Sequence, residues 1–327
     1  MNVKVSIIIP AYNMSSFLGY CLSSCINQTF VDLEIIVVND GSTDTTSDVI
    51  KEYAALDERI VMVDQNNQGV IYARKDKSGL EVARGEYVFY LDGDDFLEKN
   101  AISELYSEAI KRNADYVVGN FYTVYGDNRE KNCAISEING LSGQNLLIDL
   151  LNGFCWSLCG RLIRKTLFDE RIVYKPIAMG EDLFINMQIT LNVKQAAYIE
   201  LYVYNYVRHS LSVTCRHNDN AITMNIEMVE AIFDLFDIHD YEQRIINKVS
   251  LLFFPFFLSC IRKNVPDTDN RLRTYYWNKE EIRSMLWRKR KFFYLACGGY
   301  LYFPVLSRIG IEVGWRGISL LRKTRFQ

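Results

Sequence analysis

Short apolar runs alternate with stretches of helical spacing along the first hundred residues of the chain. Such runs are typical of strands buried on both faces of a sheet, and apolar residues three or four apart are typical of helices that pack on it. We expect strands at 5–9, 33–38, 60–63 and 87–91. Helices are expected between them, at 15–27, 44–56 and 70–83. This order predicts an α/β fold, with a parallel sheet covered by helices on both faces.

Beyond residue 100 the alternation is less regular. The pattern predicts helices at 101–112, 144–151 and 182–191, strands at 116–124 and 197–206, and a polar loop at 127–140. From residue 220 to the end the pattern is helical throughout. We therefore expect an α/β domain at 1–215 and a helical C-terminal region at 216–327.

The apolar run at 87–91 ends in three carboxylates within four residues, Asp92-Gly93-Asp94-Asp95. Ligands of parallel sheets gather at the carboxyl ends of the strands. Crowded carboxylates repel one another unless a cation binds them, so one interpretation is a divalent metal that bridges this acidic turn to a phosphate group. The other interpretation is a solvated turn, because Asp and Gly are ordinary turn residues.

The composition is that of a folded globular protein, with 49% hydrophobic and 24% charged residues. None of the eight cysteines forms a C-x-x-C pair, which argues against a zinc ribbon or a redox pair. The start of the chain lacks the pattern of a secretory signal, so we expect a cytoplasmic protein.

Charge is distributed unevenly along the chain. Residues 282–327 hold ten Arg or Lys and one acid, a net charge of +9; the total of −3 leaves −12 for the rest. Basic and aromatic residues together are typical of helices that lie on an anionic membrane surface, here the inner face of the plasma membrane. A helical bundle packed on the first domain is the alternative. A nucleic-acid partner is not expected, because no recognition motif accompanies the charge.

Four blocks of the first domain resemble, in order and spacing, the family 2 glycosyltransferases. They are SIIIPAYN at 6–13, VVNDGSTD at 37–44, ARGEYVFYLDGDD at 83–95 with Gly69 and Arg74 before it, and GED at 180–182. The resemblance covers residues 3–215 and makes this part the catalytic domain. It implies the GT-A fold, a doubly wound mixed sheet, with the C-terminal helical region appended.

The resemblance also implies an activity. It is inverting transfer of a hexosyl or N-acetylhexosaminyl group from a nucleotide diphosphate sugar, such as a UDP-sugar, to an acceptor hydroxyl, with Mn²⁺ or Mg²⁺ as cofactor. The acceptor would be a glycan or a lipid-linked molecule in cell-surface polysaccharide or glycolipid synthesis. The alternative is a catalytically silent relative that binds nucleotide sugars or serves as a scaffold subunit. A nucleotidyltransferase would need a glycine-rich loop after the first strand, where this chain has Pro10-Ala11-Tyr12-Asn13.

Several segments are implied in donor binding. The carboxylate of Asp40 can accept a hydrogen bond from a uracil ring N–H, although Asp-Gly-Ser is also an ordinary turn. Arg74 is a candidate for contact with the nucleotide or its diphosphate, or else a solvated helix residue. The other donor residues that the resemblance implies are Pro10, Ala11, Tyr12, Asp92, Gly93, Arg208, His209 and Ser212, the last three in a loop that would close over the diphosphate.

Within the acidic turn the resemblance gives each carboxylate a role. Asp94 would be the principal metal ligand. Asp92 would contact the ribose or a water on the metal, and Asp95 would support both. A magnesium or manganese ion takes only one or two protein carboxylates in such sites, so three are not required.

On the acceptor side, Asp182 is expected to be the general base. Inversion needs a carboxylate on the face of the sugar opposite the leaving diphosphate. Glu181 would be its catalytic neighbour and orienter, although an acidic pair is also common at the start of a helix. Trp156 would stack on an acceptor sugar or lie in the core.

Overall fold

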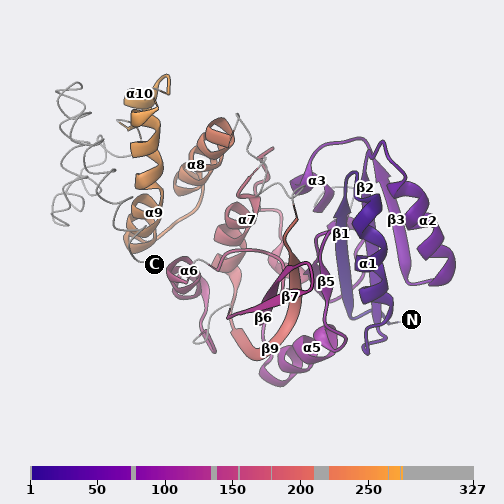
Figure 1. The fold of residues 1–327 in the computed structure, drawn as a ribbon. Coiled ribbons are helices and arrows are strands. Elements are labelled where there is room, and N and C mark those ends of the chain that lie inside the picture. The colour runs from indigo at the N-terminus through magenta and orange to yellow at the C-terminus, as the bar shows by residue number, and fades with distance from the viewer. Residues whose placement is uncertain are drawn as a thin grey trace. The chain divides into compact units, whose positions relative to one another are not determined.

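The computed structural model describes residues 2–74, 79–133, 138–153, 155–177, 179–209, 221–263, 265–272 and 274. Within them one mixed sheet is built from β1 (Val5–Ala11), β2 (Leu33–Asp40), β3 (Ile60–Gln65), β4 (Tyr87–Tyr90), β5 (Phe96–Leu97), β6 (Tyr116–Tyr125), β7 (Asn128–Asn132), β8 (Arg161–Arg164) and β9 (Ala196–Val207) (Figure 1). The helices that belong with the sheet are α1 (Ser15–Ile26), α2 (Thr46–Leu56), α3 (Val70–Arg74), α4 (Gly79–Val82), α5 (Ala101–Arg112), α6 (Gly143–Asn152) and α7 (Glu181–Ile189). Short 3₁₀ turns, η1 (Lys165–Leu167) and η2 (Thr190–Asn192), follow β8 and α7.

One part of the sheet is parallel and the remainder is mixed. The strand order is β3-β2-β1-β4-β8-β6-β9-β5, with β7 paired to β6. In parallel register, Val5 of β1 lies opposite Leu33 of β2 and opposite Tyr87 of β4. The chain thus moves from β1 to β2 and β3 on one side and returns to the other side at β4. The carboxyl ends of β1 and β4 are therefore the switch point at which such sheets bind ligands.

Alternate residues of β1 face different layers. Val5, Ile7 and Ile9 lie in an apolar core with the inner faces of α1, α2 and α5. The opposite face meets α4, where a Cβ on Gly79 would lie 2.3 Å from Cγ2 of Ile8. All residues of β1, β2 and β4 are buried. Cover on both faces explains why these strands are continuous apolar runs in the sequence.

The strands and helices predicted for the first hundred residues are confirmed, with one change. The helix predicted at 70–83 is divided into α3 and α4, and residues 75–78 between them lie outside the described residues. Beyond residue 100, the predicted helices at 101–112, 144–151 and 182–191 correspond to α5, α6 and α7. The predicted strands correspond to β6 and β9.

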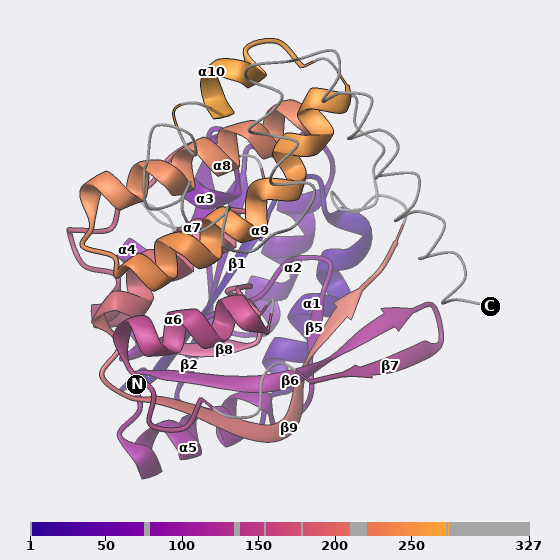
Figure 2. The ribbon, with the colours of Figure 1, turned by 90° about the vertical axis from the view of Figure 1, so that its left-hand side faces the viewer.

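Three strands lie where none was predicted. The loop predicted at 127–140 was wrong in part, because it contains β7, which forms an antiparallel hairpin with β6 (Figure 2). Its sequence NREKN is almost wholly exposed, so it carries no apolar signal. β8 separates β4 from β6 with only two apolar residues, and β5 is two residues long. Such short or exposed strands are specified by pairing with their neighbours and not by their own pattern.

The chain forms two compact units, Met1–Ile232 and Phe233–Gln327. The predicted division between residues 215 and 216 and the basic stretch at 282–327 both lie outside the described residues. The helical pattern predicted from residue 220 corresponds to α8 (Ala221–Ile238), α9 (Gln243–Arg262) and α10 (Thr268–Leu272). Over the part of the chain that the structure describes, none of the helices combines the length and the apolar character needed to cross a bilayer.

Candidate functional site

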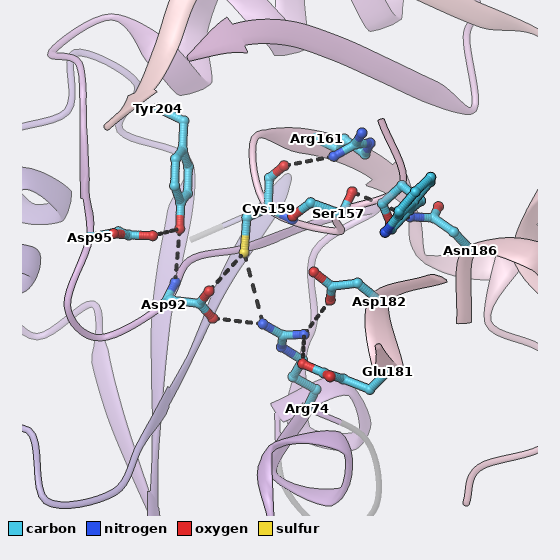
Figure 3. A network of polar contacts seen from close by, with 11 residues as sticks. Arg74, Asp92, Asp95, Ser157, Cys159, Arg161, Glu181, Asp182, Asn186 and Tyr204 are labelled. Atoms are coloured by element: carbon cyan, nitrogen blue, oxygen red, sulfur yellow. Dashed lines mark hydrogen bonds and ion pairs between the residues drawn. The ribbon is translucent and has the colours of Figure 1, made fainter. Parts of the chain in front are cut away.

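The predicted site residues gather where β2 and β4 end, at one edge of the sheet. Asp40 is the last residue of β2, and Asp92 follows β4 by two residues. Two helices bring further groups to this region: Arg74 is the last residue of α3, and Asp182 is the second residue of α7. Arg74, Asp92 and Asp182 come from segments far apart in the sequence and form one cluster of charged side chains (Figure 3).

Arg74 joins the acidic turn to the start of α7. One terminal nitrogen donates to Asp92 Oδ1 at 2.6 Å, and the other donates to Asp182 Oδ1 at 2.6 Å (Figure 3). Glu181 Oε1 lies 3.6 Å from the second nitrogen, and the guanidinium lies 5.6 Å from the ring centroid of Tyr90. Burial opposes the charge, but Asp182 and Asp92 raise the pKa of Arg74 well above its ordinary value. Three acids thus share one buried, permanent cation.

The two acids at the start of α7 are not equivalent. Asp182 makes the close contact with Arg74, and its side chain is 22% exposed. Burial, together with the neighbouring charge of Asp182, raises the pKa of Glu181 to about 7. Glu181 therefore carries a proton part of the time near neutral pH. Asp182 makes the direct ion pair with Arg74, and its role as the base stays a prediction.

Asp94 is paired with a histidine that follows β9. Its Oδ2 lies 2.8 Å from Nε2 of His209. The imidazole stacks on the ring of Phe17 from α1, with centroids 4.2 Å apart and an interplanar angle of 25°. The structure thus brings the predicted metal ligand and a residue of the predicted donor loop together, against a helix that the sequence did not connect with the site.

Asp95 lies on the inner side of the acidic turn and is 1% exposed. Its Oδ2 accepts a hydrogen bond from the hydroxyl of Tyr204 at 2.5 Å, and its Oδ1 accepts one from the backbone N–H of Val207 at 2.7 Å. Burial and the charges of Asp92 and Asp94 raise the pKa of Asp95 well above its ordinary value. This carboxyl group faces protein groups and not the exterior.

Asp92 has partners on both carboxylate oxygens. While Arg74 binds Oδ1, the thiol of Cys159 donates to Oδ2 at 3.4 Å. Burial and the charge of Asp92 raise the pKa of Cys159 well above its ordinary value, so the thiol stays protonated and can donate. The side chain of Asp92 is nevertheless 37% exposed, which leaves it within reach of a bound molecule.

Asp40 holds the segment that follows β3. Its carboxylate accepts hydrogen bonds from the side-chain amide of Gln65 at 2.6 Å and from the backbone N–H groups of Gln68 and Gly69, each at 2.9 Å. The residue is 3% exposed. These three bonds give Asp40 a structural role in shaping the loop before α3, and its contact with a uracil N–H stays a prediction.

The predicted wall of the base pocket lies beside the acidic turn. Pro10 and Ala11 end β1 and are buried, whereas Tyr12 directly after them is 45% exposed. A Cβ on Gly93 would lie 3.3 Å from the carbonyl oxygen of Pro10. The turn therefore passes close to the end of β1, where a larger residue than glycine would be crowded.

Trp156 lies in the connection between α6 and β8 and is partly buried. Its backbone carbonyl accepts a hydrogen bond from the side-chain amide of Asn186, a buried residue of α7. Arg208 follows β9, with its guanidinium 5.4 Å from the ring centroid of Tyr206. Contacts of Trp156 and Arg208 with substrates stay predictions, and Ser212 lies outside the described residues.

Several residues of the site were not predicted from the sequence. Tyr204 is one of many aromatic residues in the strand expected at 197–206, and nothing in the pattern distinguishes it. Cys159 belongs to no C-x-x-C pair, and Phe17 is one of several apolar residues in the helix expected at 15–27. The sole sequence signal for Cys159 is its position three residues after Trp156. Their roles depend on which side chains the fold places opposite them.

The donor set would suit a divalent cation only in company with a phosphate ligand. Within the described ranges, no group of three or more His, Cys, Asp and Glu side chains is arranged to hold a metal ion. The oxygens of Asp92 face Arg74 and Cys159, which leaves Asp94 as the carboxylate best placed for a metal. Mg²⁺ and Mn²⁺ commonly bind through one or two carboxylates and the oxygens of a substrate phosphate. Asp94 fits this arrangement if a diphosphate completes the site.

The chain is similar to known proteins in both its sequence and its fold. The family described as Glycosyl transferase family 2 matches residues 6–172. Glycosyltransferase GlyA of Streptococcus pneumoniae is 33% identical over an alignment of 224 positions, which covers 64% of this chain but only 31% of GlyA. Cholesterol galactosyltransferase of Borreliella burgdorferi is 29% identical over an alignment of 343 positions, which covers 97% of this chain and 94% of that protein.

Among solved structures, S. aureus TarS 1–349 in complex with UDP-GlcNAc is similar to this chain with a TM-score of 0.77. The match covers 96% of this chain and 92% of the TarS chain, at 18% sequence identity. At this identity the likeness by itself shows a common fold.

Proposed function

Because this chain belongs to glycosyl transferase family 2, we propose that it transfers a sugar from a nucleotide diphosphate sugar to an acceptor hydroxyl, with inversion at the transferred carbon. The observation that carries the proposal is the position of Arg74 between Asp92 and Asp182. One side chain spans the distance between the turn proposed to bind the donor and the carboxylate proposed to activate the acceptor. Donor and acceptor groups bound at these two acids would therefore be close enough to react.

Asp182 is proposed as the general base. It would accept the proton of the acceptor hydroxyl as that oxygen attacks the sugar and the nucleotide diphosphate leaves from the opposite face. Arg74 holds this carboxylate in position through the 2.6 Å ion pair. Glu181 lies 3.6 Å from the same Arg74 nitrogen that Asp182 contacts at 2.6 Å, and it would be the neighbour that orients Asp182.

On the donor side, the carboxylates of the acidic turn need a positive partner before a diphosphate can approach them. Asp94 would hold Mn²⁺ or Mg²⁺, which when bound supplies positive charge against the leaving diphosphate. Asp92 would contact the ribose or a water on the metal, and His209 would orient Asp94. The base pocket would be formed by Pro10, Ala11, Tyr12 and Asp40, with Gly93, Arg208 and Ser212 near the diphosphate.

The donor and acceptor classes are proposed by analogy. UDP-GlcNAc is the ligand named for TarS, which supports a UDP-sugar and a hexosyl or N-acetylhexosaminyl group. The name of the Borreliella relative, which matches this chain almost end to end, supports a lipid or lipid-linked acceptor. We propose a role in cell-surface glycan or glycolipid synthesis, with Trp156 on the acceptor side. Residues 282–327 would attach the enzyme to the inner face of the membrane.

The test is a binding screen across UDP-sugars with manganese, followed by an assay of sugar transfer or donor hydrolysis. Asp182→Asn should bind donor within about twofold of the parent but lose about a thousandfold or more in turnover, because the amide oxygen can still accept the hydrogen bond from Arg74 but cannot take up a proton. Asp94→Asn should lose the manganese-dependent part of donor binding. Asp127→Asn, in the exposed turn between β6 and β7, is the control and should behave like the parent.

Near-normal turnover by Asp182→Asn would show that another group is the base. A parent chain that bound UDP-sugars tightly but neither transferred nor hydrolysed the sugar would favour the silent, donor-binding alternative over an enzyme.

A further inference from the structure

The hydroxyl of Tyr204 lies between two parts of the acidic turn. It donates to Asp95 Oδ2 at 2.5 Å and accepts a hydrogen bond from the backbone N–H of Asp92 at 3.3 Å (Figure 3). Tyr204 is 3% exposed and Asp95 is 1% exposed. A hydrogen bond to a carboxyl group in such a site is strong because water cannot compete for either partner. One buried phenol therefore fixes the first and the last residue of the turn relative to each other.

The second oxygen of Asp95 connects the same turn to the end of β9. It accepts a hydrogen bond from the backbone N–H of Val207 at 2.7 Å. Two residues later His209 meets Asp94, with Nε2 at 2.8 Å from Oδ2. The acidic turn and the end of β9 are thus joined at two neighbouring points. A shift of one segment must be followed by the other or must break a buried hydrogen bond.

We infer that Tyr204 and Asp95 are positioning residues for sugar transfer. They hold the backbone of the acidic turn so that Asp92 and Asp94 present their carboxylates to the donor, and they keep the segment after β9 aligned with that turn. Neither side chain needs to touch the donor, because both are buried within the protein. The inference rests on the proposed function for the identity of the donor, and on the contacts themselves for the positioning.

The geometry explains why a tyrosine is needed at this place. Phenylalanine would fill nearly the same volume but would leave the Asp92 N–H and Asp95 Oδ2 without their shared partner. An unpaired buried polar group is destabilising, and the turn can avoid that cost only by moving. Movement of about 1 Å at a reacting centre is sufficient to lower a rate about a hundredfold.

The test compares Tyr204→Phe with Tyr87→Phe. Tyr87 is the matched control, because it is fully buried and lies away from the acidic turn. Its hydroxyl likewise makes two hydrogen bonds: it donates to the carbonyl oxygen of Ala114 at 2.9 Å and accepts from Arg164. We expect Tyr204→Phe to weaken the binding of UDP in the presence of manganese about tenfold, as measured by calorimetry. It should also lower kcat/KM for sugar transfer about 10- to 100-fold. Tyr87→Phe should leave both within about twofold, even if it unfolds more easily.

A second measurement needs no ligand. Backbone amide exchange of Asp92 and Val207 should become faster in Tyr204→Phe and stay unchanged in Tyr87→Phe, because only the first variant removes the hydrogen bonds of the turn. Asp95→Asn should share the effect. The double variant should lose less affinity than the sum of the two single losses, as expected for groups that act as a unit.

Unchanged exchange at Asp92 and Val207, or equal affinity for UDP with manganese in the two Tyr→Phe variants, would overturn the inference. Failure of the proposed function is a different result. In that case the parent chain itself would bind neither UDP nor a UDP-sugar, and amide exchange would still decide whether Tyr204 fixes the turn.

Discussion

Arg74 is a buried cation that holds two carboxylates with different proposed tasks. Its terminal nitrogens reach Asp92 on one side and Asp182 on the other, each at 2.6 Å. Only a guanidinium, with its planar set of donors, can bind two acids in this way at once; a lysine ammonium is a single point charge. The sequence suggested contact with the nucleotide or the diphosphate. The structure adds that this side chain connects the acidic turn with the start of α7.

We expect Arg74→Lys to keep the positive charge but lose one of the two carboxylate contacts. The result should be a fall in kcat/KM for the donor of about 10- to 100-fold, because Asp92 or Asp182 loses its fixed position. The measurement is steady-state kinetics with varied donor.

Arg164→Lys is a matched control for this prediction. Arg164 also bridges two acids, Glu86 and Asp115. Glu86 directly precedes β4, whereas the acidic turn follows the other end of that strand. Equal kinetic losses in the two variants would mean that Arg74 acts only through stability.

At the scale of elements, the start of α7 decides where the proposed base lies. Helix α7 begins after Gly180, whose φ of +82° is in the left-handed region that favours glycine. A Cβ at this position would also lie 2.0 Å from Sδ of Met228 in α8. Gly180 therefore allows both the turn into the helix and the close approach of α8, and Glu181 and Asp182 follow directly from it.

We expect Gly180→Ala to destabilise the first unit and to displace Asp182. The strained φ should cost about 1 kcal/mol, and the movement forced on Met228 should add to it. Turnover should fall more than donor affinity, because the acid that moves is on the acceptor side. Urea unfolding and donor titration measure the two effects.

Gly126→Ala is a control that separates the effect of backbone strain from the effect of steric crowding by a new Cβ. Gly126 has a φ of +55°, but a Cβ there would meet no atom within 4 Å. This control should lose about the same free energy to backbone strain and should keep its turnover. If Gly180→Ala also kept its turnover, the start of α7 would not be what positions the base.

At the scale of the whole molecule, the family and the GT-A fold predicted from the sequence are confirmed by the family match and by the likeness to TarS. The charge asymmetry concerns the other end of the chain. Residues 282–327 carry a net charge of +9 on a protein whose total is −3. Each Lys or Arg close to an anionic membrane contributes about 1 kcal/mol to attachment. Several such Lys and Arg residues together would hold a peripheral protein on the membrane surface.

We expect a full-length variant with Arg288, Lys289, Arg290 and Lys291 all changed to Gln to lose most of its sedimentation with anionic lipid vesicles. The fall in affinity should be at least about tenfold, and the parent should lose binding as salt is raised. Changing the exposed Lys111 and Arg112 of α5 to Gln is the control. Equal sedimentation of the basic-cluster variant and the parent would favour a helical bundle over membrane attachment.

Much of the fold and part of the candidate site could be predicted from the sequence. The strands β1, β2 and β4 were identified because they are buried on both faces, and burial leaves a continuous apolar run. The edge strand β7 and the two-residue β5 could not be, because an exposed or very short strand owes its existence to its partner. The local sequence pattern indicates which residues are buried, but it does not indicate which strands pair with each other.

The sequence by itself determined the order of the elements apart from β5, β7 and β8, the acidic turn after β4 and the acid pair that starts α7. Only the tertiary structure decided which groups meet. Arg74 binds Asp182 across 108 positions of the chain, and Tyr204 binds Asp95 across 109. Contacts between such distant residues depend on the strand order of the whole sheet, with β8 inserted between β4 and β6. That order is set by the free energy of the complete fold, so no short segment contains it.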